Sequence, residues 1–592
     1  MRLGLGRLVS VFSLRPALFF DLESFRFAAC HCSKRPQPQA CRIEGVSNRC
    51  TRTGLPIHWV VKENSLTARA LMILGTASHV GKSMITAGLG RIFADEGFRV
   101  VPFKAQNMSL NSAATPDGKE IARAQALQAE ACRVAASVEM NPILLKPRSD
   151  RGAQVVLLGK VWGQITASDY HTHRVEEFFP IVCRSYQKLA SEYDIVLLEG
   201  AGSPAEINLR DHDIVNLRMA RAAKANCVLV GDIDRGGVFA ALLGTMELLE
   251  RDERELIKGF VINKFRGDHR LLQPGVEIME RRLGLPCLGV VPYLQDLDLD
   301  EEDSVAVEHR RGVRRVWDHL AEDQSPRRRL RLGVIALPHM SNFTDFDGLA
   351  AEPSVALAFL EGAQDIAAAD VLILPGTKQT LDDLDWLANN NFFPRIREHC
   401  LKNRLIVGLC GGFQMLGLRL SDPSGIENHG VPVDRDGLGL LSVRTVFCQE
   451  KITRMIAAEL YDPSFAAGVW QAASFQGYEI HMGETERTAE ARPFARLSTM
   501  NGVHLLDGAV SPSGLVFGTY VHGLFDNDRF RHSFLDWARA SLRLAPAEPK
   551  VWATAERDAR LNRWANHLRG SLRLDLIRNW ISPHDLPLKM AT

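Results

Sequence analysis

Residues 71–293 alternate between short apolar runs and longer amphipathic segments. The apolar runs lie at 71–75, 100–104, 153–159, 194–200, 227–234, 259–265 and 287–293. Segments of helical length separate them, for example 84–96 and 120–136. Continuous apolar strands that alternate with helices are typical of a parallel sheet covered on both faces. This pattern predicts a first α/β domain over residues 71–304.

A second series of the same kind begins at residue 330. Its apolar runs lie at 330–337, 370–376, 404–412, 477–483 and 514–523, and they predict another α/β domain over residues 330–540. Between the two series, residues 305–329 become Arg-rich, as in a solvated linker. Residues 541–592 are charged and helical in pattern, and we interpret them as a C-terminal extension. A chain of 592 residues is long enough for two domains with extensions.

Residues 1–70 differ from the rest of the chain because they sustain neither a helical nor a strand period. Arg2, Arg7 and Arg15 are typical of a targeting peptide, but the two later arginines interrupt any apolar core of a secretory signal. A zinc site is a second interpretation, although its candidate ligands fit no common finger: Cys30, His31, Cys32, Cys41 and Cys50. We favour a third interpretation, a disordered or misassigned N-terminal extension, with folding that begins near Leu71.

Charge and composition exclude several classes of protein. Lys and Arg total 71 and Asp and Glu total 70, so no net field attracts nucleic acid or an anionic membrane. The sequence contains no run of eighteen or more uncharged apolar residues, which argues against a spanning helix. The eleven cysteines are mostly scattered, as in a protein with reduced thiols. We expect a cytoplasmic protein without nucleic-acid or membrane partners; composition does not predict its oligomeric state.

The segment from Gly75 to Ser83 follows the first predicted strand and opens the first predicted helix, which is the context of a phosphate-binding loop. Backbone N–H groups between Thr76 and Gly81 would surround phosphate oxygens. Lys82 would supply a point charge, and the Ser83 hydroxyl is a candidate ligand for Mg²⁺. The first glycine lies one residue earlier than in the usual G-x4-GK[ST] pattern, so the loop is a variant. The alternative is a Gly-rich turn without a ligand.

This variant loop resembles that of the dethiobiotin-synthetase-like group, whose members use ATP to activate a carboxylate. Glu199 ends a predicted strand at the edge where α/β sheets bind ligands, so it is a candidate Mg²⁺ ligand together with Ser83. Lys104 ends another strand and is a candidate to neutralise charge on the transferred phosphoryl group. Asn263 resembles the adenine-reading position of the same group. The alternative for each of these residues is an ordinary polar residue at the end of a strand, without a role in binding.

Two further carboxylates, Asp232 and Asp234, follow a central predicted strand together with Arg235. Asp232 or Asp234 is a candidate to assist Mg²⁺ or to position the substrate, and Arg235 is a candidate to pair with a substrate carboxylate. Structural salt bridges are the alternative for all three. The chemistry implied by the phosphate site is conversion of a carboxylate to an acyl phosphate, because phosphate is a good leaving group and carboxylate oxygen is not.

A second candidate centre surrounds Cys410, which lies between a predicted strand and a predicted helix and is flanked by glycines. This is the pattern of a nucleophile elbow, in which the helix N-terminus stabilises a thiolate and following N–H groups bind an oxyanion. The segment resembles the Cys loop of class I glutamine amidotransferases. That resemblance implies an oxyanion hole formed by the backbone of Gly376 and Gly411, and His522 as the base. The alternative is a buried structural cysteine in a Gly-rich turn.

The surroundings of His522 depart from the pattern of that class. Many class I members place a glutamate two residues after the histidine, but this position is Leu524. Asp526 is a candidate replacement, and a Cys–His dyad is the alternative. His481 is a rival base that we interpret as structural, because a lone histidine at a strand end more often has a structural role.

The order of the two centres, a P-loop synthetase followed by a Cys–His glutaminase in one chain, resembles the corrinoid amidotransferases. Eight stretches carry this resemblance: 103–112, 120–131, 141–147, 200–209, 232–240, 262–268, 342–347 and 374–380. It implies an ATP- and Mg²⁺-dependent ligase of cobalamin biosynthesis that binds glutamine and a corrinoid. The expected reaction is amidation of the b, d, e and g carboxylates of adenosylcobyrinic acid a,c-diamide, through acyl phosphates, with ammonia passing between the sites.

Three alternatives remain open at this point. One is a different ATP-dependent amidotransferase, such as a cobyrinic acid a,c-diamide synthase. Another is a P-loop scaffold or partitioning ATPase, although such switches carry an additional lysine early in the loop, where this chain has Thr76, Ala77 and Ser78. The third is a glutaminase domain that is only structural, given Leu524.

Overall fold

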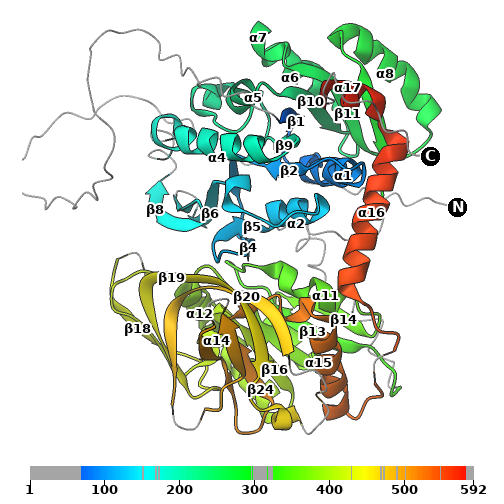
Figure 1. Cartoon of the computed structure of the whole chain (residues 1–592). Coiled ribbons are helices and arrows are strands. Elements are labelled where there is room, and N and C mark those ends of the chain that lie inside the picture. The colour runs from blue at the N-terminus through cyan, green and yellow to red at the C-terminus, as the bar shows by residue number, and fades with distance from the viewer. Residues whose placement is uncertain are drawn as a thin grey trace, which may run out of the picture. The chain divides into compact units, whose positions relative to one another are not determined.

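Figure 1 shows the computed structural model of the chain, and its described residues belong to one compact unit. The structure describes residues 68–581 except for these gaps: 150–151, 167–169, 171–173, 295–296, 298–316, 318–324, 429, 467–469, 471–473, 489–490, 500–501 and 547. The expectations for residues 1–67, including the candidate zinc ligands, lie outside the described residues. Most of the expected linker 305–329 also lies outside them.

Six of the seven apolar runs of the first series form one parallel sheet (Figure 1). Its order is β12 (Cys287–Pro292), β11 (Ile257–Phe265), β10 (Asn226–Asp232), β1 (Arg69–Gly75), β9 (Ile195–Glu199) and β2 (Val100–Phe103). Along β1, Leu71 and Ile73 enter one hydrophobic core whereas Met72 and Leu74 enter another. Successive side chains of a strand point to opposite faces, so both faces of this sheet are buried, as the continuous apolar pattern predicts.

The helices of this part of the chain include α1 and α8, which flank the sheet in Figure 1. Their bounds are α1 (Lys82–Asp95), α2 (Arg123–Ala131), α4 (Phe179–Glu192), α5 (Leu217–Ala223), α6 (Val238–Leu248), α7 (Arg251–Arg254) and α8 (His269–Leu283). Expected helix 84–96 corresponds to α1. The expected helix 120–136 is partly wrong, because its first residues form β5 (Glu120–Ala122), which pairs with β4 (Ser112–Ala114). Helical periodicity does not reveal that Glu120 is held by the Ser112 hydroxyl, 2.8 Å away, across this ribbon.

The run at 153–159 is not a strand of the parallel sheet, so that expectation is wrong. It forms β7 (Gly152–Leu157) in a separate sheet of order β3 (Gln106–Met108), β6 (Ile143–Ser149), β7 and β8 (Lys160–Thr166). β7 pairs antiparallel with both of its neighbours. A short apolar run fits an antiparallel strand as well as a parallel one, and only its pairing decides between them.

The second series forms another mainly parallel sheet, which confirms two α/β domains with a P-loop-type domain first. Its order is β14 (Val355–Leu360), β13 (Leu330–Ile335), β15 (Val371–Leu374), β16 (Leu405–Leu409), β24 (Val516–Thr519) and β23 (Ala509–Val510). Only the β23–β24 pair is antiparallel. The associated helices are α11 (Asp347–Ala350), α12 (Thr380–Asn389), α13 (Phe392–Leu401), α14 (Gly411–Leu416) and α15 (Asp528–Ser541).

The run at 477–483 lies in a third, mostly antiparallel sheet, so its place in the parallel series is also wrong. That sheet runs β18 (Val433–Asp436), β17 (Arg419–Asp422), β19 (Val443–Leu460), β20 (Ser474–Arg487) and β25 (Val521–His522), with β21 (Ala495–Thr499) on β19 and β22 (His504–Asp507) on β21. β20 pairs antiparallel with β19 along most of its length. The polar residues inside this run, Glu479 and His481, are the signal that distinguishes it from a strand buried in a parallel sheet.

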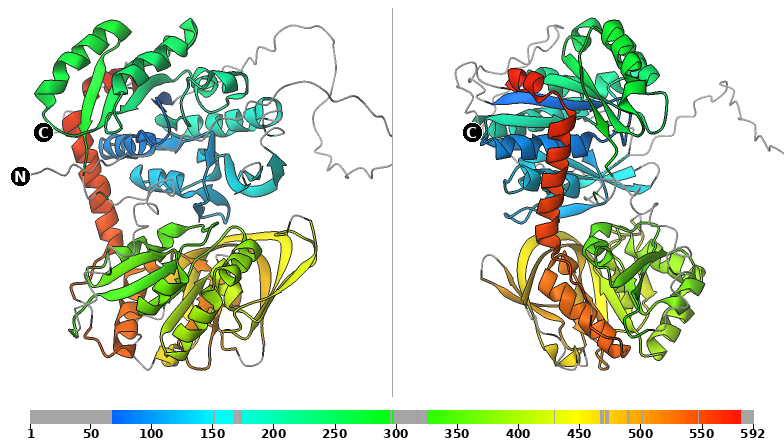
Figure 2. Two further views of the ribbon diagram at one scale, coloured as in Figure 1. Left: turned by 180° about the vertical axis from the view of Figure 1, so that it is seen from behind. Right: turned by 90° about the vertical axis from the view of Figure 1, so that its right-hand side faces the viewer.

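The C-terminal helices α16 (Ala553–Ser571) and α17 (Leu574–Ile581) pack against the first sheet. Figure 2 shows α16, in red, beside α1, in blue. The indole of Trp564 donates a hydrogen bond to the Met84 carbonyl, 2.6 Å away, and Asp558 lies 2.8 Å from the buried guanidinium of Arg91. These helices therefore bury part of the helix that begins at Lys82.

Candidate active site

The loop between β1 and α1 has the backbone that the phosphate-site pattern requires. Gly81 is in the left-handed region (φ 98°) immediately before α1. A side chain at Gly81 would overlap the amide of Asn263, which donates a hydrogen bond to the Val80 carbonyl at 2.8 Å. Asn263, expected near adenine by resemblance, is thus buried against the loop backbone.

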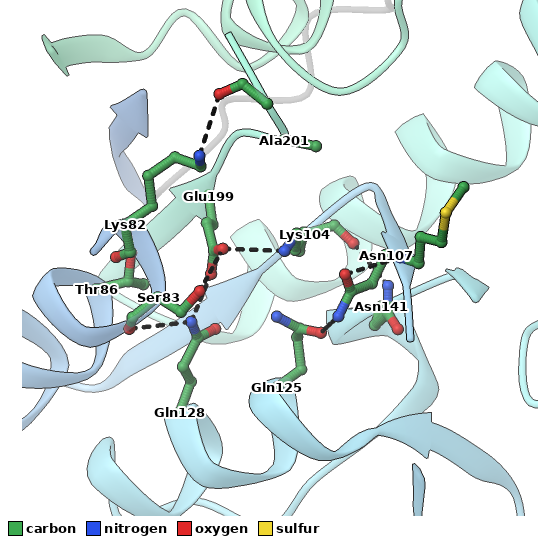
Figure 3. A network of polar contacts seen from close by, with 12 residues as sticks. Lys82, Ser83, Thr86, Lys104, Asn107, Gln125, Gln128, Asn141, Glu199 and Ala201 are labelled. Atoms are coloured by element: carbon green, nitrogen blue, oxygen red, sulfur yellow. Dashed lines mark hydrogen bonds and ion pairs between the residues drawn. The ribbon is translucent and has the colours of Figure 1, made fainter. Parts of the chain in front are cut away.

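Glu199 is the hub of the site at the carboxyl edge of the first sheet (Figure 3). The Ser83 hydroxyl donates to Glu199 Oε1 at 2.8 Å, and Lys104 Nζ reaches the same oxygen at 3.0 Å. Gln128 Nε2 donates to the other oxygen at 2.6 Å. Lys82 Nζ donates to the carbonyls of the loop residue Ala77 (2.9 Å) and of Gly202 after β9 (3.1 Å). We call the five side chains that gather here the phosphate centre: Lys82, Ser83, Lys104, Gln128 and Glu199.

Gln128 is the member of this centre that the sequence did not predict. It lies on α2 and is 1% exposed, as is Glu199. A buried amide on the apolar face of a helix needs a hydrogen-bond partner, and this requirement is the signal by which the sequence could have indicated Gln128. The other four residues come together as expected.

The phosphate centre also offers ligands that fit Mg²⁺. The Ser83 hydroxyl and the Glu199 carboxylate present two adjacent oxygens, and Mg²⁺ typically takes one or two protein oxygens and completes its shell with phosphate and water. The weaker candidates also form ion pairs: Asp232 lies 3.0 Å from Lys264, and Asp234 lies 2.9 Å from Arg266. Within the described ranges no group of three or more His, Cys, Asp or Glu side chains has the arrangement of a metal site.

Cys410 occupies a strained turn between β16 and α14. Its φ of 50° and ψ of −110° are unusual for a residue with a side chain, and its amide is anchored to the Thr519 carbonyl at 2.9 Å. A side chain at Gly412 would overlap the Leu374 carbonyl, and one at Gly411 would overlap Thr377. The glycines after the cysteine are therefore required because the loop that follows β15 packs directly on the elbow.

Gly376, Cys410 and His522 converge as the sequence predicted. A Cβ atom built at Gly376 would lie 3.1 Å from His522 Cε1 and 3.6 Å from Cys410 Cβ. His522 ends β25, in a different sheet from the strand before Cys410. Gly411 opens α14 immediately after the cysteine, so its amide lies at a helix N-terminus.

The carboxylate beside His522 belongs to Asp345, which the sequence did not assign. Asp345 Oδ2 lies 2.7 Å from His522 Nδ1, and Asp345 Oδ1 accepts from the Gly523 amide at 2.9 Å. Burial alone would lower the pKa of His522, but the charge and hydrogen bond of Asp345, with a smaller contribution from Cys410, raise it to about 10. Cys410, His522, Asp345 and Gly376 are called the thiol centre below.

Asp526, the candidate replacement suggested by its position in the sequence, does not take this place. Its carboxylate lies 3.6 Å from Arg123 and 3.9 Å from Arg557. Asp345 is in η4 (Phe343–Phe346), far from His522 along the chain. The stretch 342–347 resembles the corrinoid amidotransferases, but nothing in its local pattern connects it with a histidine 177 residues later.

His481, the rival base, has partners other than Asp345. Its ring stacks on Tyr520 at 3.7 Å, its Nδ1 lies 3.2 Å from the Gly483 carbonyl, and its Nε2 lies 3.7 Å from Glu479. A small cavity of about 40 Å³ opens beside Cys410 and His481. Its wall includes Lys378, Glu427 and Lys451 of the second part of the chain and Lys146 of β6 in the first.

Comparisons with known proteins identify both parts of the chain as domains of known families. Residues 71–306 match the CobQ/CobB/MinD/ParA nucleotide binding domain, and residues 331–530 match the CobB/CobQ-like glutamine amidotransferase domain. A cobyric acid synthase of Syntrophobacter fumaroxidans is 44% identical over 87% of this chain and 99% of its own length. The cobyric acid synthase of Klebsiella pneumoniae strain 342 is 46% identical over 88% of this chain and 99% of its own length. That of Sorangium cellulosum is 47% identical over 86% of this chain and 97% of its own length. The chain belongs to the cobyric acid synthase family.

Membership of this family confirms the resemblance to corrinoid amidotransferases. The protein is an enzyme, a glutamine-dependent carbon–nitrogen ligase whose nucleotide-binding domain precedes its amidotransferase domain. In the part of the chain that the structure describes, no helix combines the length and the apolar character needed to cross a bilayer.

Proposed function

We propose that this protein is a cobyric acid synthase, which amidates the b, d, e and g carboxylates of adenosylcobyrinic acid a,c-diamide. Glutamine would supply the ammonia, and one ATP would be used at each amidation. The relatives that carry this name are matched over nearly their whole length. The observation that carries the proposal is that a thiol centre and a phosphate centre occur in one compact unit, and that Lys146 of the first domain lines the cavity beside Cys410.

The thiol centre would hydrolyse glutamine in two steps. The Cys410 thiolate attacks the side-chain amide carbon, and the resulting oxyanion accepts hydrogen bonds from backbone amides at Gly376 and Gly411. The protonated ring of His522 gives its proton to the leaving nitrogen, so ammonia departs and a thioester remains. Water then attacks the thioester, which releases glutamate and restores the thiol. Asp345 supports these steps because it holds the ring by Nδ1 and favours the imidazolium form.

The phosphate centre would activate the corrinoid carboxylate. A carboxylate oxygen attacks the γ-phosphorus of ATP and ADP leaves; ammonia then attacks the acyl carbon and phosphate leaves. Lys82 and Lys104 supply positive charge where charge accumulates on the transferred group. Ser83 and Glu199 would hold Mg²⁺, which would neutralise the negative charge of the ATP phosphates.

Ammonia would pass from the thiol centre to the phosphate centre inside the protein. Free ammonia at neutral pH is mostly protonated and then is not a nucleophile, so internal transfer has a chemical reason. The cavity beside Cys410 supports this, because its wall contains Lys146 of the first domain and Lys451 of the second. Glu120 links the two domains there, since it accepts hydrogen bonds from Lys451 at 2.5 Å and from the Ser112 hydroxyl at 2.8 Å.

The test is to incubate the full chain with adenosylcobyrinic acid a,c-diamide, ATP, Mg²⁺ and glutamine and to determine the product mass. Replacement of four hydroxyl groups by amino groups is the expected result. The same incubation with cobyrinic acid separates this activity from that of an a,c-diamide synthase, which would accept that substrate and add two amides. No change in the mass of the a,c-diamide would refute the proposal.

A further inference from the structure

A buried turn of the nucleotide-binding domain contacts the turn that carries Asp345. The Ser112 amide donates to Asn342 Oδ1 at 3.0 Å, and the Phe343 amide donates to Asn111 Oδ1 at 3.3 Å. Asn111, Ser112 and Asn342 are each no more than 4% exposed. The two asparagines thus satisfy each other's neighbouring amides across the boundary between the two domains, and unpaired amides would be costly in a buried position.

Asn342 in turn fixes the position of the carboxylate. Its backbone is left-handed (φ 53°), and its carbonyl accepts from the Asp345 amide at 3.0 Å, which closes the turn that directs Asp345 to His522. The preceding residue, Ser341, donates its amide to the Gly376 carbonyl at 2.9 Å. One turn therefore contacts the histidine partner and the expected oxyanion loop.

A second residue, Tyr478, contacts the face of the His522 ring. Tyr478 on β20 stacks on the His522 ring with the ring centres 5.5 Å apart. Its hydroxyl donates to the Ser112 carbonyl at 3.0 Å. The imidazole is therefore held by Asp345 and by Tyr478. Residues 111–112 of the nucleotide-binding domain contact Tyr478 directly and also contact the turn that carries Asp345.

The same segment of the first domain begins in the phosphate centre (Figure 3). Lys104 pairs with Glu199, and its carbonyl accepts from Asn141 at 3.1 Å. Further along, Asn107 donates to Gln125 of α2 at 2.9 Å. Residues 104–112 thus connect the phosphate centre with Asn342 and Tyr478 through buried contacts.

We propose that Asn111 and Ser112 of the nucleotide-binding domain, acting through Asn342 and Tyr478, are positioning residues that hold Asp345 and His522 in line with Cys410. Glutamine hydrolysis then depends on the geometry of the nucleotide-binding domain, because these contacts hold groups of the thiol centre. This inference rests on the proposed glutaminase reaction and extends it. A displacement of about 1 Å at a catalytic group lowers a rate by about 10²-fold, so small shifts of this turn are sufficient.

Two variants of the full chain test the proposal. Tyr478→Phe keeps the stacked ring and removes the hydroxyl that donates to Ser112, and Asn111→Ala removes the acceptor for Phe343. Tyr186→Phe is the matched control, because this buried tyrosine hydroxyl donates to the Ala223 carbonyl at 3.3 Å, within the first domain. For each protein, kcat and KM of glutamate release and the rate of amidation with ammonium chloride are measured.

We expect kcat of glutamate release to fall about 10- to 100-fold in at least one of the two variants. KM for glutamine, the ammonia-driven rate and the thermal midpoint should change no more than they change in Tyr186→Phe. Unchanged glutamate release in both variants would overturn the inference, as would an equal loss in the ammonia-driven reaction. If the wild-type protein released no glutamate at all, the proposed glutaminase itself would be wrong, so the two failures are distinguishable.

Discussion

The phosphate centre and the thiol centre use different means to bring their residues together. Lys82, Ser83, Lys104 and Glu199 all follow or end neighbouring strands of one parallel sheet, so its carboxyl edge assembles them. The thiol centre takes Cys410 from one sheet, His522 from another, and Asp345 from a turn that the first domain contacts. A site on one sheet edge is robust to changes elsewhere, whereas a site assembled from three elements depends on the contacts that hold each of them.

The largest difference between the centres should appear when the nucleophile is removed. Cys410→Ala should lower glutamine-driven amidation by about 10⁶-fold, the effect of deleting a nucleophile that acts as one unit with its base. Ammonia-driven amidation should remain, because the phosphate centre is intact. Product formation is measured with each nitrogen donor, with the half-buried Cys448→Ala as the control. Retained glutamine-driven synthesis in Cys410→Ala would exclude this thiol as the nucleophile.

Asp345→Asn should reduce kcat of glutamate release by about 10³- to 10⁴-fold, since an amide no longer stabilises the imidazolium form of His522. Asp345 raises the pKa of His522, so its loss lowers that pKa. The protonated ring then persists only to a lower pH, and the alkaline limb of the pH profile should move towards neutrality. The measurement is kcat against pH for the variant and the wild type. An unshifted alkaline limb would contradict the role of Asp345.

Lys82→Ala should lower amidation by about 10²- to 10³-fold with glutamine and with ammonia alike, because it removes charge stabilisation at the phosphoryl group. Basal glutamate release without ATP should stay near the wild-type rate. Lys188→Ala, which affects an exposed lysine paired with Glu139, is the control. A loss restricted to the glutamine-driven reaction would show that Lys82 affects the thiol centre, and it would contradict our proposal.

The smallest effect on chemistry, but a clear one on stability, is expected at Glu120, which lies between Lys146 and Lys451 at the domain boundary. Glu120→Gln leaves two buried ammonium groups without their counter-charge, and we expect a loss of about 3–5 kcal/mol in the free energy of unfolding. Burial opposes ionisation of Glu120, but the two lysines outweigh it and hold its pKa below the usual range.

The lowered pKa of Glu120 determines how the free energy of unfolding depends on pH. A carboxylate with a lowered pKa stabilises the fold above its unfolded pKa of about 4.3, and this contribution is lost as the pH falls below that value. The difference between wild type and Glu120→Gln should therefore shrink in acid, measured by urea unfolding at several pH values. The double variant Glu120→Gln/Lys451→Met should recover part of the stability. A difference that grows in acid would be inconsistent with an ionised Glu120.

Local pattern predicted the parts of each centre that lie next to a turn. Gly81, Lys82 and Ser83 follow one strand, and Cys410 with its glycines follows another, so strand, turn and helix N-terminus are visible in a few residues. Pattern was insufficient for 153–159 and 477–483, whose pairing is antiparallel. Apolar periodicity reports burial, and strand direction depends on a partner elsewhere in the chain.

Sequence pattern alone was enough to predict two α/β domains, a candidate phosphate loop, a thiol at a strand–helix elbow and the order of the two domains. The folded chain was needed to show that Gln128 joins the phosphate centre and that Asp345, not Asp526, lies beside His522. It was also needed to show that Asn111 and Ser112 contact Phe343, Asn342 and Tyr478. The reason is physical: a turn or a helix cap is fixed by neighbours in sequence, whereas a buried polar side chain is satisfied by whichever group folding brings within hydrogen-bond distance.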